Sequence, residues 1–285
     1  MKIACVGCSW TEGIRPDGYP LEKEQTYAYA LSKWLENKKI KNTVYNAGRS
    51  GSSVDFYPIV IDYLLKEFNP DVFIIQMTTF DRNIMILDPL LEEDKKINFG
   101  YDQLSSQYYK IWDNNTNLIH LGPGMGWLAA DSTSRKRIQV NDIKYSAKLK
   151  DLDTDMFKRI WEDRIKGKVA PNITLSEFSD FVSIWWEQYG HDTNYRPYQY
   201  YNQIYSLEDQ LKALGKKVIP FYWLNFKPVN HNKLLPVRQY TVVENLFDEI
   251  TFKKLQIDDG WHFGKEGNTR LVQEFLGPQV LETMK

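Results

Sequence analysis

Short apolar runs alternate with amphipathic segments at both ends of this 285-residue chain, and that alternation limits the folds it can adopt. Runs of strand length predict buried strands over residues 2–7, 42–46, 71–77 and 217–223. Apolar residues at helical spacing predict helices over residues 24–37, 53–68, 198–214 and 265–284. Strands that alternate with helices usually pair in parallel and are covered on both faces. The pattern therefore predicts a three-layer α/β/α domain with a mainly parallel sheet. Pro220, which has no backbone N–H, predicts that the far half of the last strand is a sheet edge or a bend.

Residues 91–197 interrupt this alternation. They contain aromatic pairs at 108–109 and 185–186, a glycine-rich turn at 122–126 and a basic stretch at 134–150. Long irregular insertions in compact domains are typically functional, so we interpret 91–197 as an inserted, lid-like, helical and aromatic-rich subdomain on a core of residues 1–90 and 198–285. Its rings could form a wall for a sugar or acyl group, or fill the subdomain's own core. The basic stretch is typical of a solvated surface.

Composition limits the partners of the chain. It carries 36 Lys and Arg residues against 37 Asp and Glu residues, so a net charge of −1 provides no general attraction for nucleic acid or anionic lipid. No apolar run approaches the roughly eighteen residues of a membrane span. The opening residues MKIACVG are interpreted as a strand rather than a signal peptide, and two cysteines fit a reducing compartment. We expect a cytoplasmic protein without a membrane partner; the sequence does not indicate an oligomeric state.

A serine follows the first predicted strand, in the order Gly7-Cys8-Ser9. Open α/β folds bind ligands at the carboxyl edge of the sheet, so Ser9 is a candidate nucleophile at that edge. The simpler alternative is that Ser9 only caps the following turn. Cys5 and Cys8 also form a C-x-x-C pair, but Cys5 lies inside the strand and no second pair completes a zinc site. We interpret Cys5 as a core residue, with a redox pair as the weaker alternative.

An aspartate and a histidine lie close together near the other end of the chain, as Asp259 and His262. A carboxylate three residues before a histidine can accept a hydrogen bond from Nδ1 and leave Nε2 to take a hydroxyl proton. The chain has four histidines, and the pair His191-Asp192 is a weaker rival because it lies in a polar, tyrosine-rich loop. Asp259 and His262 are therefore the candidate partners of the serine.

A third block runs from Asn46 to Gly51 after the second predicted strand. A glycine there lets a backbone N–H approach a reacting oxygen, although, taken alone, the block is better explained as an ordinary strand-to-helix loop. In order and position, the three blocks resemble the SGNH (GDSL-type) serine hydrolase family: Gly-Asp-Ser after the first strand, Asn-x-x-x-x-Gly after the second and Asp-x-x-His near the C-terminus. The resemblance covers residues 1–90 and 198–285, with Cys8 in place of the family's aspartate.

The resemblance implies a flavodoxin-like α/β fold and a serine esterase. Ser9 would attack the ester carbonyl, His262 would take its proton, and Asp259 would orient the imidazole. Backbone N–H groups of Ser9 and Gly51 would stabilise the oxyanion. The implied substrate is a small-molecule or glycan O-acyl ester, such as an O-acetylated carbohydrate, with no metal and no organic cofactor. Transfer of the acyl group to another acceptor by the same triad is an alternative.

The family's Gly-x-Asn-Asp block falls on residues 78–81, which places Phe80 where the family has an oxyanion-binding asparagine. Phenylalanine cannot donate a hydrogen bond. We expect the hydroxyl of Thr78 or Thr79, or the guanidinium of Arg82, to replace that donor. If none does, the alternative is a non-catalytic SGNH-like protein that binds a ligand in the same pocket.

Overall fold

The structure is a computed structural model of the chain. It describes residues 1–13, 21–49, 52–78, 83–86, 99–113, 118–121, 127–128, 138–139, 174, 195–223, 238–257 and 262–285. Within these ranges, no helix combines the length and the apolar character needed to cross a membrane.

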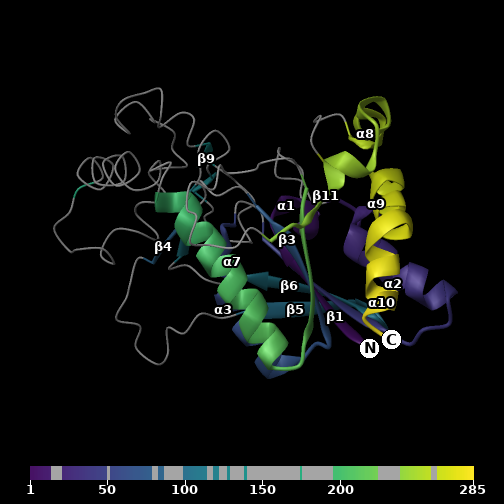
Figure 1. Cartoon of the computed structure of the whole chain (residues 1–285), viewed down its shortest axis with the longest axis horizontal. Helices are drawn as coiled ribbons and strands as arrows, with labels where there is room; N and C mark the ends of the chain where they lie inside the picture. Colours follow the sequence, from purple (N-terminus) through teal and green to yellow (C-terminus); the bar gives the residue numbers. More distant parts are fainter. Residues whose placement is uncertain are drawn as a thin grey trace.

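A seven-stranded sheet forms the centre of the described structure (Figure 1). Its strands are β1 (Lys2–Gly7), β2 (Thr43–Gly48), β3 (Val72–Met77), β5 (Phe99–Ser105), β6 (Tyr108–Asp113), β10 (Lys217–Tyr222) and β11 (Thr241–Val242). They lie in the order β11-β10-β3-β1-β2-β6-β5, and neighbours are parallel except for the antiparallel pair β5 and β6. Counted along the chain, β1, β2, β3, β10 and β11 follow the flavodoxin-like order 2-1-3-4-5. This order confirms the predicted α/β class with a mainly parallel sheet.

Helices cover both faces of the sheet (Figure 1). One face carries α2 (Tyr27–Asn37), α9 (Lys265–Leu271) and α10 (Gly277–Glu282), and the other carries α3 (Tyr57–Glu67) and α7 (Tyr195–Ala213). Successive side chains of a strand point to opposite faces. In β1, Ile3 and Cys5 accordingly pack in the core under the first group of helices, whereas Ala4 and Val6 pack under the second. The predicted three-layer arrangement is confirmed.

Local signals explain several helix boundaries. At the start of α2, the Thr26 hydroxyl oxygen accepts a hydrogen bond from the backbone N–H of Tyr29 at 3.3 Å. Pro58 lies in the first turn of α3, where its missing N–H leaves no helical bond unmade. Gly215, with φ of 72°, follows the end of α7 in the left-handed conformation that glycine tolerates best.

The remaining described elements are short. The helical ones are α1 (Ser9–Glu12), η1 (Lys23–Gln25), η2 (Val54–Phe56), η7 (Val243–Leu246), α8 (Glu249–Leu255) and the π-helical η8 (Val272–Leu276). The strands are β4 (Asn83–Ile86), β7 (Leu118–Leu121), β8 (Trp127–Leu128) and β9 (Ile138–Gln139). The helix predicted over 265–284 is thus α9, η8 and α10 in succession, and the helices predicted from 24 and 53 begin as the 3₁₀ turns η1 and η2.

Pro220 does not bend the strand in which it lies. β10 pairs with β3 as far as Tyr222, which lies opposite Met77. On its other side, β11 pairs only with Phe221 and Tyr222. The prediction that the second half of β10 forms a sheet edge was wrong, because this half lies between β3 and β11. Pairing with β11 begins at Phe221, just after Pro220, which has no N–H to donate.

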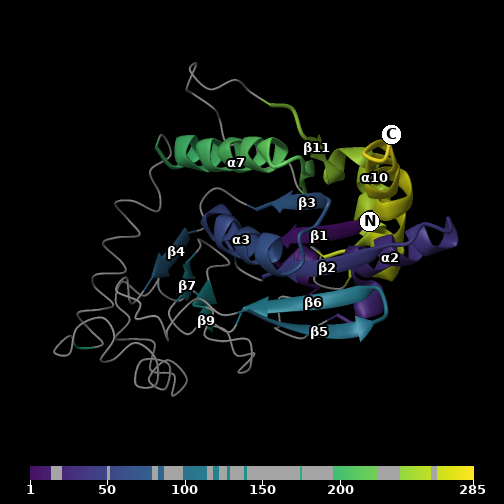
Figure 2. The same cartoon turned by 90° about the horizontal axis from the view of Figure 1, so that it is seen from below.

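Part of the segment 91–197 extends the main sheet. β6 pairs in parallel with β2, and β5 lies outside β6 at the sheet edge (Figure 2). β4 pairs with β7 and β8 pairs with β9 in two further antiparallel sheets. The turn at 122–126, the aromatic pair at 185–186 and most of the basic stretch lie outside the described residues. The lid-like helical subdomain stays a prediction.

Candidate active site

Ser9 begins a one-turn helix directly after the central strand of the sheet. β1 ends at Gly7, and in α1 the backbone N–H groups of Thr11 and Glu12 donate to the carbonyl oxygen of Cys8 at 3.0 and 2.9 Å. β1 lies between β2 and β3, and the helices α2 and α3 that follow β1 and β2 cover opposite faces. Half-buried Ser9 therefore lies at the point where the direction of winding changes, the usual ligand-binding position of such sheets.

His262 reaches Ser9 from the other end of the sequence. Its Nε2 lies 2.9 Å from the Ser9 Oγ, although the residues are 253 positions apart. Backbone bonds fix the chain around the histidine: the Ile257 N–H donates to the His262 carbonyl at 2.7 Å, and the Gly264 N–H donates to that of Leu255 at 3.0 Å. The histidine is 5% exposed. The structure thus brings two of the predicted site residues within the distance needed for proton transfer.

Aromatic rings surround the histidine. The Trp10 ring meets the His262 imidazole edge-on, with centroids 5.7 Å apart, and stacks on Trp223 at 5.0 Å. Trp223 in turn meets Phe263 edge-on at 5.0 Å. None of these rings is among the site residues that the motifs predict. Their positions in the sequence could have indicated that they lie near the site, because Trp10 follows Ser9, Phe263 follows His262 and Trp223 follows β10.

The loop after β2 is tied to the end of β1. The Arg49 backbone N–H and the Ser52 hydroxyl both donate to the carbonyl oxygen of Gly7, at 2.9 and 3.1 Å. Gly48 lies so close to α1 that an added Cβ would collide with the backbone nitrogen of Glu12. The described part of the predicted Asn46–Gly51 block, residues 46–49, therefore packs directly against the turn that carries the serine.

Ser9, whose backbone N–H is a predicted oxyanion donor, lies within the described residues, and so does one of the three candidates for the remaining donor, Thr78. Thr78 lies at the carboxyl end of β3 and is 3% exposed, and its hydroxyl makes no hydrogen bond to the described part of the chain. Its backbone carbonyl accepts a hydrogen bond from the Tyr200 hydroxyl at 2.6 Å. The other predicted residues, and the rival pair, lie outside the described residues: Gly51, Thr79, Phe80, Arg82, His191, Asp192 and Asp259. Their roles stay predictions.

A buried glutamine contacts the serine turn, and the sequence analysis missed it. Gln76 lies in β3, which is otherwise apolar, and has no exposed surface. Its Oε1 accepts from the Cys8 backbone N–H at 3.0 Å and from the Thr11 hydroxyl at 2.8 Å, and its Nε2 donates to the Cys8 Sγ at 3.1 Å. A lone amide in a buried strand was the available signal, because buried polar groups almost always have partners.

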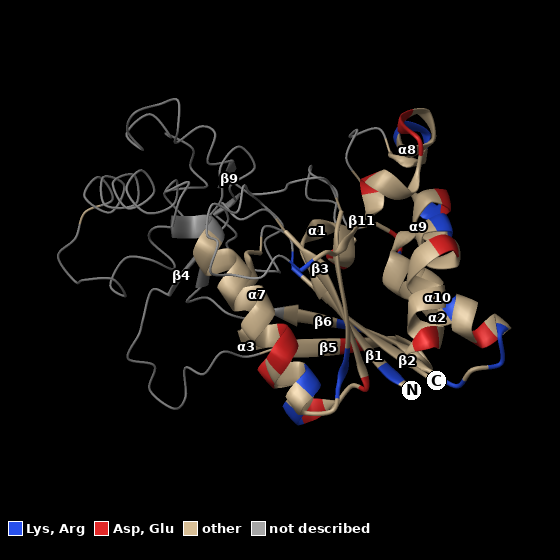
Figure 3. Cartoon of the chain, viewed as in Figure 1, with Lys and Arg blue, Asp and Glu red and all other residues tan. Residues whose placement is uncertain are grey.

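The two cysteines lie three positions apart in the sequence, and both thiols are inaccessible. Cys5 and Cys8 are both unpaired and buried, and burial raises the pKa of the Cys5 thiol. No group of three His, Cys, Asp or Glu side chains suited to a metal ion occurs in the described ranges. On the outer surfaces of α7, α8 and α9, basic and acidic residues alternate (Figure 3). The charge distribution there favours neither an anionic nor a cationic ligand.

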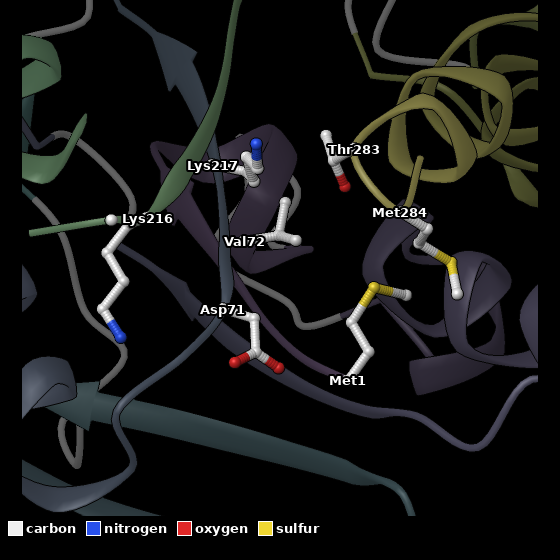
Figure 4. Close-up of a pocket in the computed structure, with 8 residues that line it drawn as sticks. Met1, Asp71, Val72, Lys216, Lys217, Thr283 and Met284 are labelled. Carbon is white, nitrogen blue, oxygen red and sulfur yellow. The ribbon is translucent and has the colours of Figure 1, made fainter.

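A separate open cavity lies at the amino edge of the sheet (Figure 4). Its volume is about 370 Å³, and its walls come from the two chain ends and the starts of β3 and β10: Met1, Asp71, Val72, Gly215, Lys216, Lys217, Thr283 and Met284. Ser9 follows the carboxyl end of β1, so the cavity and the serine lie at opposite edges of the sheet.

Comparisons with known proteins return solved structures alone. No protein-family model matches the chain, and no curated protein matches it. An acetyl-xylooligosaccharide esterase variant from a Geobacillus species shares 14% identity at a TM-score of 0.41, over 97% of this chain and 92% of that one. A family 3 carbohydrate esterase from Clostridium thermocellum shares 15% identity at a TM-score of 0.35, over 100% of this chain and 98% of that one. At these values the likenesses carry no weight, and the fold class rests on the strand order.

Proposed function

We propose that the chain is a serine esterase that hydrolyses an O-acyl ester, with O-acetylated carbohydrate as the candidate substrate class. The observation that carries the proposal is the 2.9 Å distance between the Ser9 Oγ and the His262 Nε2. A neutral imidazole nitrogen at this distance can accept the hydroxyl proton as the oxygen attacks a carbonyl carbon. The substrate class comes from the family resemblance of the sequence motifs.

In the proposed reaction, the Ser9 Oγ bonds to the ester carbonyl carbon while the His262 Nε2 takes its proton. The tetrahedral intermediate then collapses, the bond to the alcohol oxygen breaks, and the imidazolium gives its proton to that oxygen. Water attacks the acyl-enzyme by the same route, releasing the acid and restoring the serine. Asp259 accepts a hydrogen bond from Nδ1 and stabilises the imidazolium.

The oxyanion of the intermediate needs hydrogen-bond donors. We assign the backbone N–H groups of Ser9 and Gly51 to this role, with a third donor from Thr78, Thr79 or Arg82. The buried Thr78 hydroxyl supports its own assignment, because it lies at the carboxyl end of β3 and makes no bond to the described residues. A buried hydroxyl without a partner is costly unless a ligand uses it.

A fluorophosphonate probe tests the nucleophile. We expect the wild-type chain to be labelled and to hydrolyse p-nitrophenyl acetate, and Ser9→Ala to lose both reactions, because the attacking oxygen is removed. Ser206→Ala is the matched control: Ser206 is exposed on α7, and this variant should react at the wild-type rate. Intact-mass spectrometry measures labelling, and absorbance measures hydrolysis.

Phe80, in place of the family's oxyanion asparagine, favours a second candidate, a non-catalytic binding protein. Absence of wild-type labelling at millimolar probe would support that candidate and contradict the esterase. The acyltransferase alternative predicts an acylated alcohol rather than free acid when a sugar acceptor is added. Chromatography of the products separates the two reactions.

A further inference from the structure

The geometry points to Gln76 as a positioning residue that holds the turn carrying Ser9; this inference rests on the proposed esterase function. Gln76 does not touch the reacting atoms. Its amide instead binds the residues on both sides of the serine, Cys8 before it and Thr11 after it. A single side chain thus fixes the start and the end of the turn from which the nucleophile projects.

The three hydrogen bonds are complementary. The Cys8 N–H and the Thr11 hydroxyl both donate, so they require the amide oxygen, and they meet Oε1 at 3.0 and 2.8 Å. The amide nitrogen is left to face the thiol, at 3.1 Å. An amide satisfies all three partners at once, whereas an apolar side chain of similar size would leave the Cys8 N–H buried without this acceptor.

Burial makes this network rigid. Gln76 and Thr11 have no exposed surface, and the Thr11 hydroxyl also meets the Tyr27 hydroxyl at 2.9 Å. The backbone of Gln76 is held as well, because its carbonyl accepts from the Tyr57 hydroxyl at 2.6 Å. Water therefore cannot replace the amide without a change in packing.

Gly7 provides the space that the amide occupies. A Cβ added there would lie 2.5 Å from the Gln76 Oε1 and 2.8 Å from the Gln76 Cβ. The last residue of β1 thus has no side chain where β3 inserts its amide. This close packing is expected if Gln76 maintains the position of the serine turn and does not merely fill space in the core.

The proposed consequence is kinetic. Proton transfer from Ser9 to His262 depends on a distance of 2.9 Å between atoms on separate elements. Misplacement of a nucleophile by about 1 Å can cost on the order of 100-fold in rate. Loosening the turn should therefore lower kcat far more than it changes KM.

The test compares Gln76→Met, Gln76→Glu and Asn42→Leu by steady-state kinetics. Met removes all three bonds at similar length, and we expect kcat to fall about 10- to 100-fold with KM within about 3-fold of wild type. Glu keeps an acceptor oxygen for Cys8 and Thr11, so kcat should recover at least about 10-fold relative to Met. Asn42 is the control, because it is a buried amide that lies just before β2, at the edge of the sheet opposite Ser9. Its side chain donates to the carbonyl oxygens of Ser32 and Ile40. Asn42→Leu should reduce stability and leave kcat unchanged.

Circular dichroism confirms that each variant is folded. If Gln76→Met does not fold, Thr11→Val removes one of the bonds and should lower kcat about 3- to 10-fold. Wild-type kcat in the folded Met or Val variant, equal losses in Met and Glu, or an equal loss in Asn42→Leu would overturn the inference. Failure of the esterase proposal looks different, because the wild-type chain itself would then show neither turnover nor probe labelling.

Discussion

Gly7 is the residue at which the strand, the serine turn and the glutamine meet. Its carbonyl accepts two hydrogen bonds from the loop after β2, and its missing side chain leaves room for the amide of Gln76. The close contact to the Gln76 Cβ cannot be relieved by rotating the amide, because that carbon is fixed by β3. A methyl group at this position must move backbone.

We expect Gly7→Ala to lower the free energy of unfolding by about 1–3 kcal/mol, the usual cost of overpacking a core, and to lower kcat because the turn is displaced. Urea denaturation and esterase kinetics measure the two effects. Gly215→Ala is the control: it meets no atom within 4 Å but has φ of 72°, so it should lose about 1–2 kcal/mol with kcat unchanged. Equal kcat in both variants would contradict the prediction.

Sequence reasoning at this scale identified Ser9 and His262, which the structure places at hydrogen-bond distance. It succeeded there because each motif fixes its residue relative to a strand or helix end. It missed Gln76 because the partners of that amide lie 65 and 68 positions away. Which neighbouring strand a side chain meets is set by sheet order, and no local pattern contains that information.

At the scale of elements, a cluster of ion pairs joins α7 to residues 238–240, the segment that leads into β11. The Glu208 carboxylate binds Lys212 of α7 at 2.6 Å, and Arg238 and the Tyr240 hydroxyl at 2.8 and 2.6 Å. Burial alone would raise the pKa of Glu208, but the hydrogen bonds from these three residues outweigh it and lower the pKa from its ordinary value. The carboxylate form therefore holds the edge strand against the helix.

We expect Glu208→Gln to lower the free energy of unfolding by about 1–2 kcal/mol at pH 7, because charge-assisted bonds are lost. The pKa of Glu208 is lower in the folded chain than in the unfolded chain, so its carboxylate stabilises the fold at pH values above the unfolded pKa. That contribution disappears as the pH falls through the folded pKa. The gap between wild type and variant should therefore close below the ordinary glutamate pKa of 4.5. Urea denaturation across pH measures it. Glu249→Gln, which breaks the exposed pair with Lys253, is the control and should leave stability nearly unchanged, because solvent screens that pair. A gap between wild type and Glu208→Gln that persists in acid would contradict the prediction.

The sequence predicted the inner strands well and the outer ones poorly. β1 has the predicted bounds, and β3 and β10 differ from theirs by a single residue at one end. These strands are buried on both faces, so their apolar runs are continuous. β11 has only two residues, too few to show an apolar pattern in the sequence. β5 is exposed along much of its length, so its place in the sheet depends on pairing with β6.

At the scale of the whole molecule, both cores contain buried phenols. Burial raises the pKa of Tyr108 to about 12 and raises the pKa values of Tyr27 and Tyr200 well above the ordinary value. The folded chain therefore keeps these protons at pH values where the unfolded chain loses them. Their contribution to stability is present below the unfolded pKa of about 10 and is lost as pH rises through the folded values.

We expect the free energy of unfolding to fall above pH 10 by about 1.4 kcal/mol per pH unit for each such tyrosine. Tyr108→Phe should reduce that slope by about 1.4 kcal/mol per pH unit up to about pH 12. The variant also loses the hydrogen bond that the Tyr108 hydroxyl accepts from Asn46 at 2.9 Å. Urea titrations between pH 8 and 12 test this. A free energy of unfolding that stays constant above pH 10 in the wild-type chain would contradict the prediction.

The separation of Ser9 and His262 by 253 positions has a consequence for biosynthesis. A ribosome therefore delivers the hydroxyl 253 residues before it delivers the imidazole. The nascent polypeptide can thus expose its serine to solvent, and to reactive electrophiles, without being able to turn over an ester. Premature termination anywhere upstream of the histidine would yield fragments that lack the proposed activity.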